Sequence, residues 1–405
     1  MRYAHLMGLR GGTLVVKFAL TVFLARFAGL DVLGAYGLVV GLTLALPVVV
    51  RAGLLNTLIR DLVDAEPYKI ATDLKHYGVW CAGVYVAMLP VAVAMDVWPV
   101  WPDMQGLAVL IWAIVALEHV AVDVVVMLNN MRKPQVANMF GLLQAVVWSV
   151  PFMVASFWWP HLCTVEALLV FWVGGTVVAL AGVWPWFSNL PWASTGKVSE
   201  AWYCRNLKGS FMLWLHDGTS TVGQFADRYL VAGLLNLEMT GVYTLFLQIA
   251  NALFTLVNAS ILQVHRPQLL VLYRKASTQA EAAQFLRSIQ RESLGVLAIL
   301  SVMAGGMLAW CAPWLGKPLV VQYIPLLGAV LLASWLRIAS WTYLMALMAL
   351  KKDKMLLVSN AIGVIVALAA SWMLINATGS YAMAWGACMG CTLTCVLGYY
   401  GIRRA

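Results

Sequence analysis

The stretch LMGLRGGTLVVKFALTVFLARFAGL, residues Leu6–Leu30, has the length and apolar character of a membrane-spanning helix but carries basic side chains inside it. A helix needs roughly 20 mainly apolar residues to cross a bilayer. Arg10 and Lys17 interrupt the apolar run, and no small-residue cleavage site follows, unlike a removable signal peptide. We therefore expect this stretch to stay in the mature protein as its first transmembrane helix.

The whole chain shares this apolar character. Its residues are 62% hydrophobic and only 11% charged, whereas soluble domains carry about 25% charged residues. We predict an all-α polytopic membrane protein with about twelve spans. They are expected near Leu6–Leu30, Tyr36–Ile59, Tyr77–Met95, Gly106–Leu128, Val136–Phe157, Ala167–Phe187, Leu207–Leu230, Val242–Val264, Leu294–Trp314, Ile324–Leu350, Met355–Ile375 and Tyr381–Tyr400.

Basic residues between these spans indicate the orientation. Most of the 26 Lys and Arg fall on one side, whereas Arg26, Arg228 and Lys317 fall on the other. The positive-inside rule then places both termini in the cytoplasm. The same rule explains the net charge of +9, because the basic residues are scattered over short loops beside the membrane. We expect no nucleic-acid partner.

An internal repeat predicts two lobes. The repeated segments are Ala28-Gly29-Leu30 with Gly34-Ala35-Tyr36, and Ala232-Gly233-Leu234 with Gly241-Val242-Tyr243. Repeats with an even number of spans keep the same orientation in the membrane, so the halves should be related by an axis along its normal. We expect an N-terminal six-helix lobe over residues 1–190, a cytoplasmic linker over 191–206 and a C-terminal six-helix lobe over 207–405, around a central cavity.

Four basic residues lie within predicted spans: Arg10, Lys17, Arg51 and Arg337. A cation at the centre of a spanning helix costs about 2.5–3.5 kcal/mol on insertion scales, so such residues usually face a wet cavity, an anion or a counter-charge. We predict that they line a cationic substrate cavity. For Arg51 an equal alternative is that its side chain snorkels to the cytoplasmic surface.

Polar residues recur at helical spacing and indicate which spans line water. In the first span Thr13 falls on the same face as Arg10 and Lys17, and Gln224, Gln248 and Asn251 occupy similar stripes in the seventh and eighth spans. We predict that they line the cavity. The alternative is that these side chains only join helices by hydrogen bonds, as is common in membranes.

Acidic residues within the spans are candidates for ion coupling. Glu118 and Asp123 are five residues apart and must point in different directions, whereas His119 and Asp123 share a helix face; Asp217 lies in the seventh span. Carboxylates inside a membrane are typical of proton and cation relays. Structural ion pairs with the cationic residues are the alternative.

The sequence gives no sign of an enzyme. No loop exceeds about 30 residues, so there is no soluble catalytic domain, and the seven Cys and six His show no metal-ligand spacing. We expect no catalytic residues, no cofactor and no metal.

Several short motifs make the chain resemble the polysaccharide branch of the MOP exporter superfamily, the Wzx-type flippases of O-antigen and other lipid-linked repeat units. The motifs are Phe23-Leu24-Ala25-Arg26-Phe27-Ala28-Gly29 with Gly34-Ala35-Tyr36-Gly37, Ala226-Asp227-Arg228-Tyr229 leading to Gly241-Val242-Tyr243, and Arg266-Pro267-Gln268. The resemblance implies a MOP-type fold that alternates access to a cationic cavity.

The resemblance also implies the cargo: an oligosaccharide on undecaprenyl pyrophosphate, moved from the cytoplasmic to the periplasmic leaflet of a bacterial inner membrane. We expect a monomer that contacts membrane lipids and is coupled to a proton or sodium gradient, with a polysaccharide polymerase as a candidate partner. The alternatives are a multidrug exporter or another lipid-linked precursor exporter of the superfamily. A membrane polysaccharide polymerase or glycosyltransferase is disfavoured, because neither a large outer loop nor an acidic cytoplasmic cluster is visible.

Overall fold

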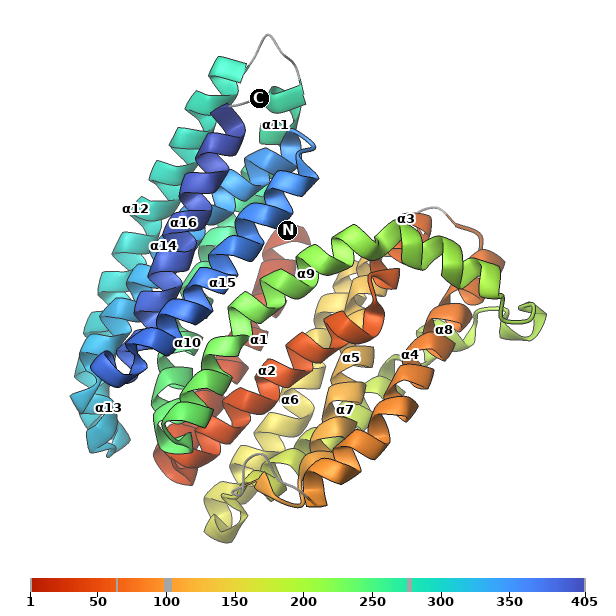
Figure 1. Cartoon of the computed structure of the whole chain (residues 1–405). Helices are drawn as coiled ribbons and strands as arrows, with labels where there is room; N and C mark the ends of the chain where they lie inside the picture. The colour runs from red at the N-terminus through yellow and green to blue at the C-terminus, as the bar shows by residue number, and fades with distance from the viewer. Residues whose placement is uncertain (1, 63–64, 98–103, 275–278, 404–405) are drawn as a thin grey trace. The chain divides into compact units, whose positions relative to one another are not determined.

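The computed structural model describes residues 2–62, 65–97, 104–274 and 279–403, and within them the chain is built from helices without a β-strand (Figure 1). Eleven helices of this described part are long and apolar enough to cross a membrane. The all-α polytopic prediction is therefore confirmed.

The seventh predicted span, Leu207–Leu230, differs from the other eleven. It lies within a long helix, α9 (Glu200–Leu234), as the sequence predicts, but α9 is not among the eleven apolar helices. Asp217, Asp227 and Arg228 account for its polarity. Its length suits a span, whereas its composition requires polar surroundings along part of it.

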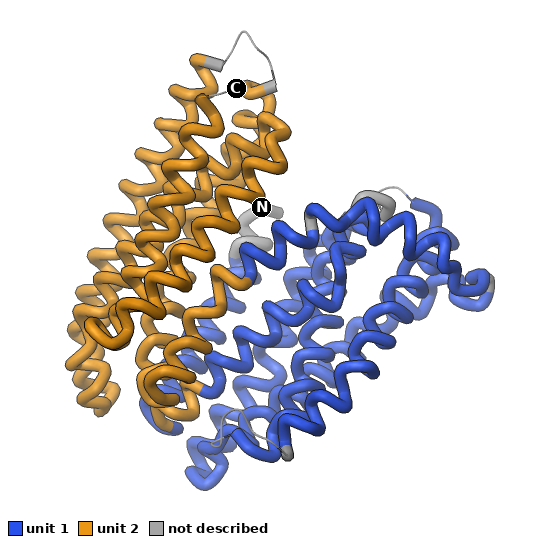
Figure 2. Tube along the Cα trace, in the orientation of Figure 1, with its two compact units in different colours: residues 1–28, 35–221 blue, residues 29–34, 222–405 orange. Residues whose placement is uncertain are grey.

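The chain divides into two compact units, each described here by itself (Figure 2). Unit 1 comprises residues 1–28 and 35–221, and unit 2 comprises residues 29–34 and 222–405. Both α2 and α9 contribute residues to each unit.

Unit 1 is a bundle in which α6 packs against α1 and α7, and α5 packs against α4, α6 and α7. Its helices are α1 (Arg2–Phe23), a π-helical turn (Leu24–Ala28), most of α2 (Leu30–Arg51), α3 (Leu54–Leu62), α4 (Pro67–Val97), α5 (Ala108–Asn130), α6 (Pro134–Trp158), α7 (Val165–Val183), α8 (Pro185–Ser188) and the first part of α9, with short 3₁₀ turns at Pro160–Leu162 and Trp192–Ser194. A buried apolar cluster joins α3, α4, α5, α6, α7 and α8.

In unit 2, α16 packs along both α14 and α15, and α14 also contacts α10 and α12. Its helices are the end of α9, α10 (Leu237–Val257), a π-helical turn (Asn258–Leu262), α11 (Gln263–Arg274), α12 (Gln279–Cys311), a 3₁₀ turn (Ala312–Leu315), α13 (Pro318–Gln322), α14 (Ile324–Ala349), α15 (Asp353–Thr378) and α16 (Tyr381–Arg403). Small residues permit this close packing: a Cβ on Gly390 would lie 2.3 Å from the Gly363 carbonyl oxygen.

The second predicted span, Tyr36–Ile59, is wrong at its C-terminal end. Helix α2 ends at Arg51, and the chain turns through Ala52 and Gly53, both with positive φ (46° and 79°), before α3 begins. Positive φ suits Gly53, and a Cβ there would also lie 2.7 Å from the Ser210 Cβ of α9. The hydrophobicity of Leu54, Leu55 and Leu58 is explained by their burial in unit 1 rather than by continuation of the span.

Two glycines of the repeat lie at one helix crossing in unit 2. A Cβ on Gly34 would lie 2.1 Å from the Leu237 carbonyl oxygen, and one on Gly241 would lie 1.9 Å from the Leu30 carbonyl oxygen. The first turns of α2 and α10 therefore approach backbone to backbone, which only glycine permits. The repeat detected in the sequence marks this contact.

Candidate functional site

A buried polar cluster in unit 1 contains Arg51, His119 and Asp123. Arg51 is the last residue of α2, and its Nη2 lies 2.5 Å from Asp123 Oδ1 of α5. Arg51 Nε donates to His119 Nε2 at 3.2 Å, Tyr77 Oη donates to Asp123, and Tyr85 Oη lies 3.0 Å from His119 Nδ1. The Arg51 and Asp123 side chains are 17% and 6% exposed, so the ion pair is largely desolvated.

His119 Nε2 lies close to both a donor, Arg51 Nε, and an acceptor, the Asp123 carboxylate. An arginine N–H can only donate, so His119 Nε2 accepts and the imidazole proton sits on Nδ1, directed at Tyr85 Oη. The same Nε2 is nonetheless 3.0 Å from Asp123 Oδ2, so a second proton on the imidazole would create a new donor to that carboxylate.

Glu118 belongs to a different network, as its helical position predicts. Its Oε1 accepts from Gln144 Nε2 and Trp172 Nε1, both at 2.5 Å, and lies 3.5 Å from Thr176 Oγ1. The Trp172 ring stacks on Trp148 with 4.8 Å between centroids. Glu118 thus joins α5 to α6 and α7 through hydrogen bonds to neutral side chains, a structural role that differs from the ion pair given as its alternative.

The polar residues along α1 differ in what their side chains contact. Arg10 is exposed and donates from Nε to Asn138 Oδ1 of α6 at 2.9 Å, and Lys17 is also exposed. Thr13 and Thr21 instead donate to carbonyl oxygens of their own helix. The two cations, rather than the hydroxyl groups, remain available to a ligand.

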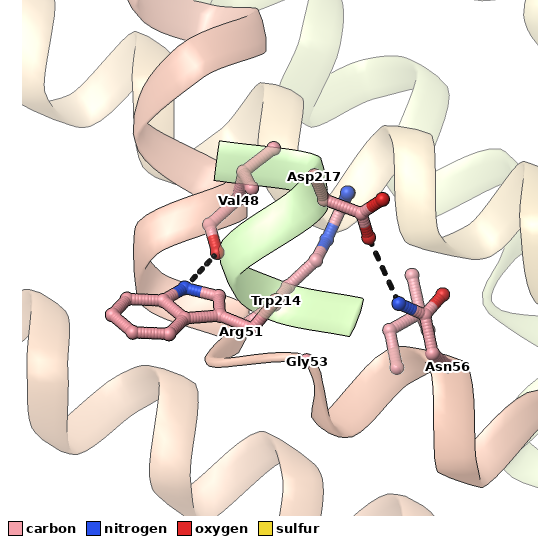
Figure 3. A pocket seen from close by; sticks show the side chains of 7 residues that line it. Val48, Arg51, Gly53, Asn56, Trp214 and Asp217 are labelled. Atoms are coloured by element: carbon pink, nitrogen blue, oxygen red, sulfur yellow. Dashed lines mark hydrogen bonds between the residues drawn. The ribbon is translucent and has the colours of Figure 1, made fainter. Parts of the chain in front are cut away.

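The turn between α2 and α3 and the facing part of α9 line a pocket in unit 1 (Figure 3). Asn56 Nδ2 donates to Asp217 Oδ2 at 2.9 Å, and Trp214 Nε1 donates to the Val48 carbonyl oxygen at 3.1 Å. The lining residues are Val48, Arg51, Gly53, Leu55, Asn56, Trp214 and Asp217. Arg51 therefore lies in a half-buried site with a counter-charge and beside a pocket, which favours the cavity-lining prediction for this residue over snorkelling.

Unit 2 brings two of the predicted cavity residues together. Arg337 Nη1 of α14 donates to Asn251 Oδ1 of α10 at 3.1 Å, and its guanidinium lies 4.3 Å from the centroid of Phe254. Gln248 is half-buried one turn earlier on α10, whereas Gln224 of α9 is exposed. Arg337 is thus held by an amide and an aromatic face.

A half-buried carboxylate in unit 2, Asp227, belongs to the polar stripe of α9 and to a motif of the resemblance, but the sequence predicted no partner for it. Asp227 of α9 accepts from Tyr243 Oη at 2.9 Å and from the backbone N–H of Arg228 at 2.8 Å. Asp227 and Tyr243 both stand in the motifs that carry the family resemblance, and their contact ties the end of α9 to α10.

Other residues of these sites were also missed. Tyr77, Tyr85, Asn56 and Trp214 lie in apolar or unremarkable sequence. For Trp214 a signal exists, since it precedes Asp217 by three residues and so shares its helix face. Across the described residues, no group of three or more His, Cys, Asp or Glu is arranged to hold a metal ion.

No protein-family model matches the sequence, and no curated protein matches it by sequence. Solved structures do match the fold. The lipid II flippase MurJ in an inward closed conformation has a TM-score of 0.76 at 9% identity, with 98% of this chain and 87% of MurJ covered. A multidrug resistance MATE family transporter of the MOP superfamily, in an inward-facing conformation, has a TM-score of 0.70 at 12% identity, with 97% and 94% covered.

A third match is the Vibrio cholerae MATE transporter VcmN, with a TM-score of 0.61 at 12% identity and coverage of 99% and 96%. At these identities the likeness is one of fold. The chain has the fold of MOP-superfamily transporters, which includes a lipid flippase and multidrug exporters.

Proposed function

We propose that this protein is a flippase that moves an oligosaccharide linked to undecaprenyl pyrophosphate from the cytoplasmic to the periplasmic leaflet of a bacterial inner membrane. The fold supports transport but is common to lipid flippases and drug exporters. The observation that favours an anionic lipid-linked cargo is the set of cations within membrane-spanning helices: Arg10 and Lys17 on α1 and Arg337 on α14.

These cations suit a diphosphate. Arg10 and Lys17 are exposed, and Arg337 is half-buried against Asn251 and Phe254 without a carboxylate within ion-pair distance among the described residues. Guanidinium and ammonium groups bind phosphate oxygens through charge-assisted hydrogen bonds. Arg51 differs, because Asp123 already neutralises it. We therefore assign the diphosphate to the other three.

Replacing Arg10, Lys17 or Arg337 by alanine is expected to lower flipping of the lipid-linked oligosaccharide by about 10- to 100-fold. A hydrogen bond to a charged group contributes about 1.5–3 kcal/mol. The measurement is transport in proteoliposomes, with surface-polysaccharide production in cells as the second readout. Exposed Lys69→Ala in unit 1 and Arg287→Ala in unit 2 are matched controls. Normal transport by all three variants, with protein present in the membrane, contradicts the proposal.

Coupling to an ion gradient is proposed to act through His119 and Asp123. A proton on His119 Nε2 would replace Arg51 Nε as the partner of this nitrogen and turn the 3.0 Å contact with Asp123 into a hydrogen bond. The resulting imidazolium would repel Arg51. Protonation would thereby rearrange the contacts that join α2 to α5.

An imposed proton gradient is accordingly expected to accelerate flipping, and His119→Gln is expected to remove this acceleration while retaining basal transport. Glutamine keeps an acceptor for Arg51 but cannot take up a proton near neutral pH. Transport is measured with a proton gradient, a sodium gradient and neither. Indifference of the unmodified protein to both gradients would remove the coupling role from His119, Asp123, Asp217 and Glu118 together.

The remaining features of the proposal are the orientation, the oligomeric state and the partner. We propose that both termini lie in the cytoplasm, as the loop charges favour, and that the working unit is a monomer without a catalytic reaction. A polysaccharide polymerase is the proposed partner that receives the flipped unit.

A further inference from the structure

The pocket at the α2–α3 turn has a chemistry different from that of the exposed cations. The space it encloses, with the open solvent at its mouth included, is about 280 Å³. Such a space is too small for an oligosaccharide or a lipid chain, and it holds one ring at most.

The pocket presents charges of both signs. Arg51 lies on one side, and Asp217 lies on another without an ion pair to Arg51 in the described structure. An anionic ligand would meet the Asp217 carboxylate, and a cationic ligand would meet the Nη1 edge of the Arg51 guanidinium, because Asp123 pairs only with Nη2. A neutral ligand with many hydrogen-bonding groups avoids both penalties.

Donors and acceptors in the pocket are left free for such a ligand. Asp217 Oδ2 accepts from Asn56, while Asp217 Oδ1 and Arg51 Nη1 have no hydrogen bond to the described residues. The carboxylate oxygen can accept from a hydroxyl group, and the guanidinium can donate to a hydroxyl or ring oxygen. Asn56 adds a carbonyl oxygen.

Trp214 supplies an aromatic surface beside these groups. Its indole N–H is already used by the Val48 carbonyl oxygen, so the ring offers a ligand mainly its apolar face (Figure 3). A polar rim next to an aromatic face matches a sugar ring, which has hydroxyl groups at its edge and C–H groups on its faces.

We infer that this pocket binds a neutral, hydroxyl-rich sugar ring of the lipid-linked substrate, separately from the cations that bind its diphosphate. The inference rests on the proposed function, since it assumes that the cargo carries a sugar. It assigns recognition of the sugar to Asn56, Trp214 and Asp217.

Binding of two kinds of probe to the purified protein tests this assignment. One probe is undecaprenyl pyrophosphate without sugar, and the others carry a single hexose, N-acetylhexosamine or uronic acid. The unmodified protein is expected to bind at least one neutral sugar probe about tenfold more tightly than the bare lipid. The anionic uronic acid probe should bind no more tightly than the bare lipid.

Trp214→Ala and Asn56→Ala are expected to abolish this sugar preference and leave binding of the bare lipid unchanged. Trp214→Phe, which keeps an aromatic face, should retain most of the preference. Trp184→Ala, at an exposed tryptophan outside the pocket, is the matched control. Lys17→Ala should weaken the binding of every probe by the same factor and leave the sugar preference unchanged.

The outcomes separate the two proposals. If no probe binds, the proposed function fails. If sugar probes bind better but Trp214→Ala and Asn56→Ala retain that preference, or lower all probes equally, the pocket assignment fails while the flippase proposal stands. Tetraphenylphosphonium tests the opposite possibility. If it binds tightly and Asp217→Asn abolishes that binding, the pocket is an organic-cation site and the sugar assignment is wrong.

Discussion

Replacing Gly241 with alanine is expected to prevent most of the protein from accumulating in a folded form, and Gly34→Ala should have a comparable effect. The added Cβ would lie 1.9 Å from the Leu30 carbonyl oxygen at Gly241 and 2.1 Å from the Leu237 carbonyl oxygen at Gly34. Both obstacles are backbone atoms, so no side-chain rotation relieves them. The first turns of α2 and α10 would have to separate.

The cost should exceed that of ordinary overpacking, which is about 1–3 kcal/mol, because two backbones must move apart. Fluorescence-detected gel filtration and thermal melting in detergent measure the effect. Gly305→Ala in α12 is the control, since a Cβ there meets nothing within 4 Å. Helix propensity alone favours alanine by about 1 kcal/mol, so this control should be as stable as the unmodified protein or more stable. Monodisperse Gly241→Ala protein with an unchanged melting temperature would refute the proposed crossing.

Arg51→Ala and Asp123→Ala are each expected to destabilise unit 1 by about 3–5 kcal/mol, the usual cost of leaving one charge of a buried pair without its partner. The pair is 2.5 Å apart with side chains 17% and 6% exposed, so solvent compensates little. The double variant Arg51→Met with Asp123→Leu should recover much of the lost stability, because it removes both charges and keeps apolar volume.

A double-mutant cycle built from Arg51→Met, Asp123→Leu and the variant that carries both measures this coupling on thermal stability. Arg26→Ala, at an exposed cation on the same unit, is the control and should change little. Additive losses in the double variant would show that the pair is not coupled. Transport by the double variant then shows whether the ion pair also acts in coupling. If the variant is stable but its transport does not respond to an ion gradient, the pair takes part in coupling.

Much of the fold could be predicted from the sequence. Long apolar runs identify eleven of the membrane helices, because a bilayer imposes length and hydrophobicity on every helix that crosses it. Helical spacing correctly separated Glu118 from His119 and Asp123, since residues four apart share a face and residues five apart do not. The polar stripe on α9 was also detected, although its polarity distinguishes α9 from the other eleven helices.

The candidate site was predicted less completely. The four cations stand out in the sequence because a charge inside a membrane-spanning helix is energetically unfavourable. The partner of Arg51 cannot be found in this way, because it depends on which helices pack together. Tyr77, Tyr85, Asn56 and Trp214 carry no charge, so a pattern of charges and apolar residues could not select them. The end of α2 at Arg51 was missed because the leucines of α3 are as apolar as a span.

The sequence by itself determined that this is a helical membrane protein with cations inside its spans, because hydrophobicity and charge act residue by residue against the bilayer. Tertiary structure alone decided which of those cations is neutralised and which groups share a pocket. Arg51 is paired with Asp123, whereas Arg337 is held by Asn251 and Phe254. Those differences arise from distances of a few ångströms between helices remote in sequence, and only packing defines them.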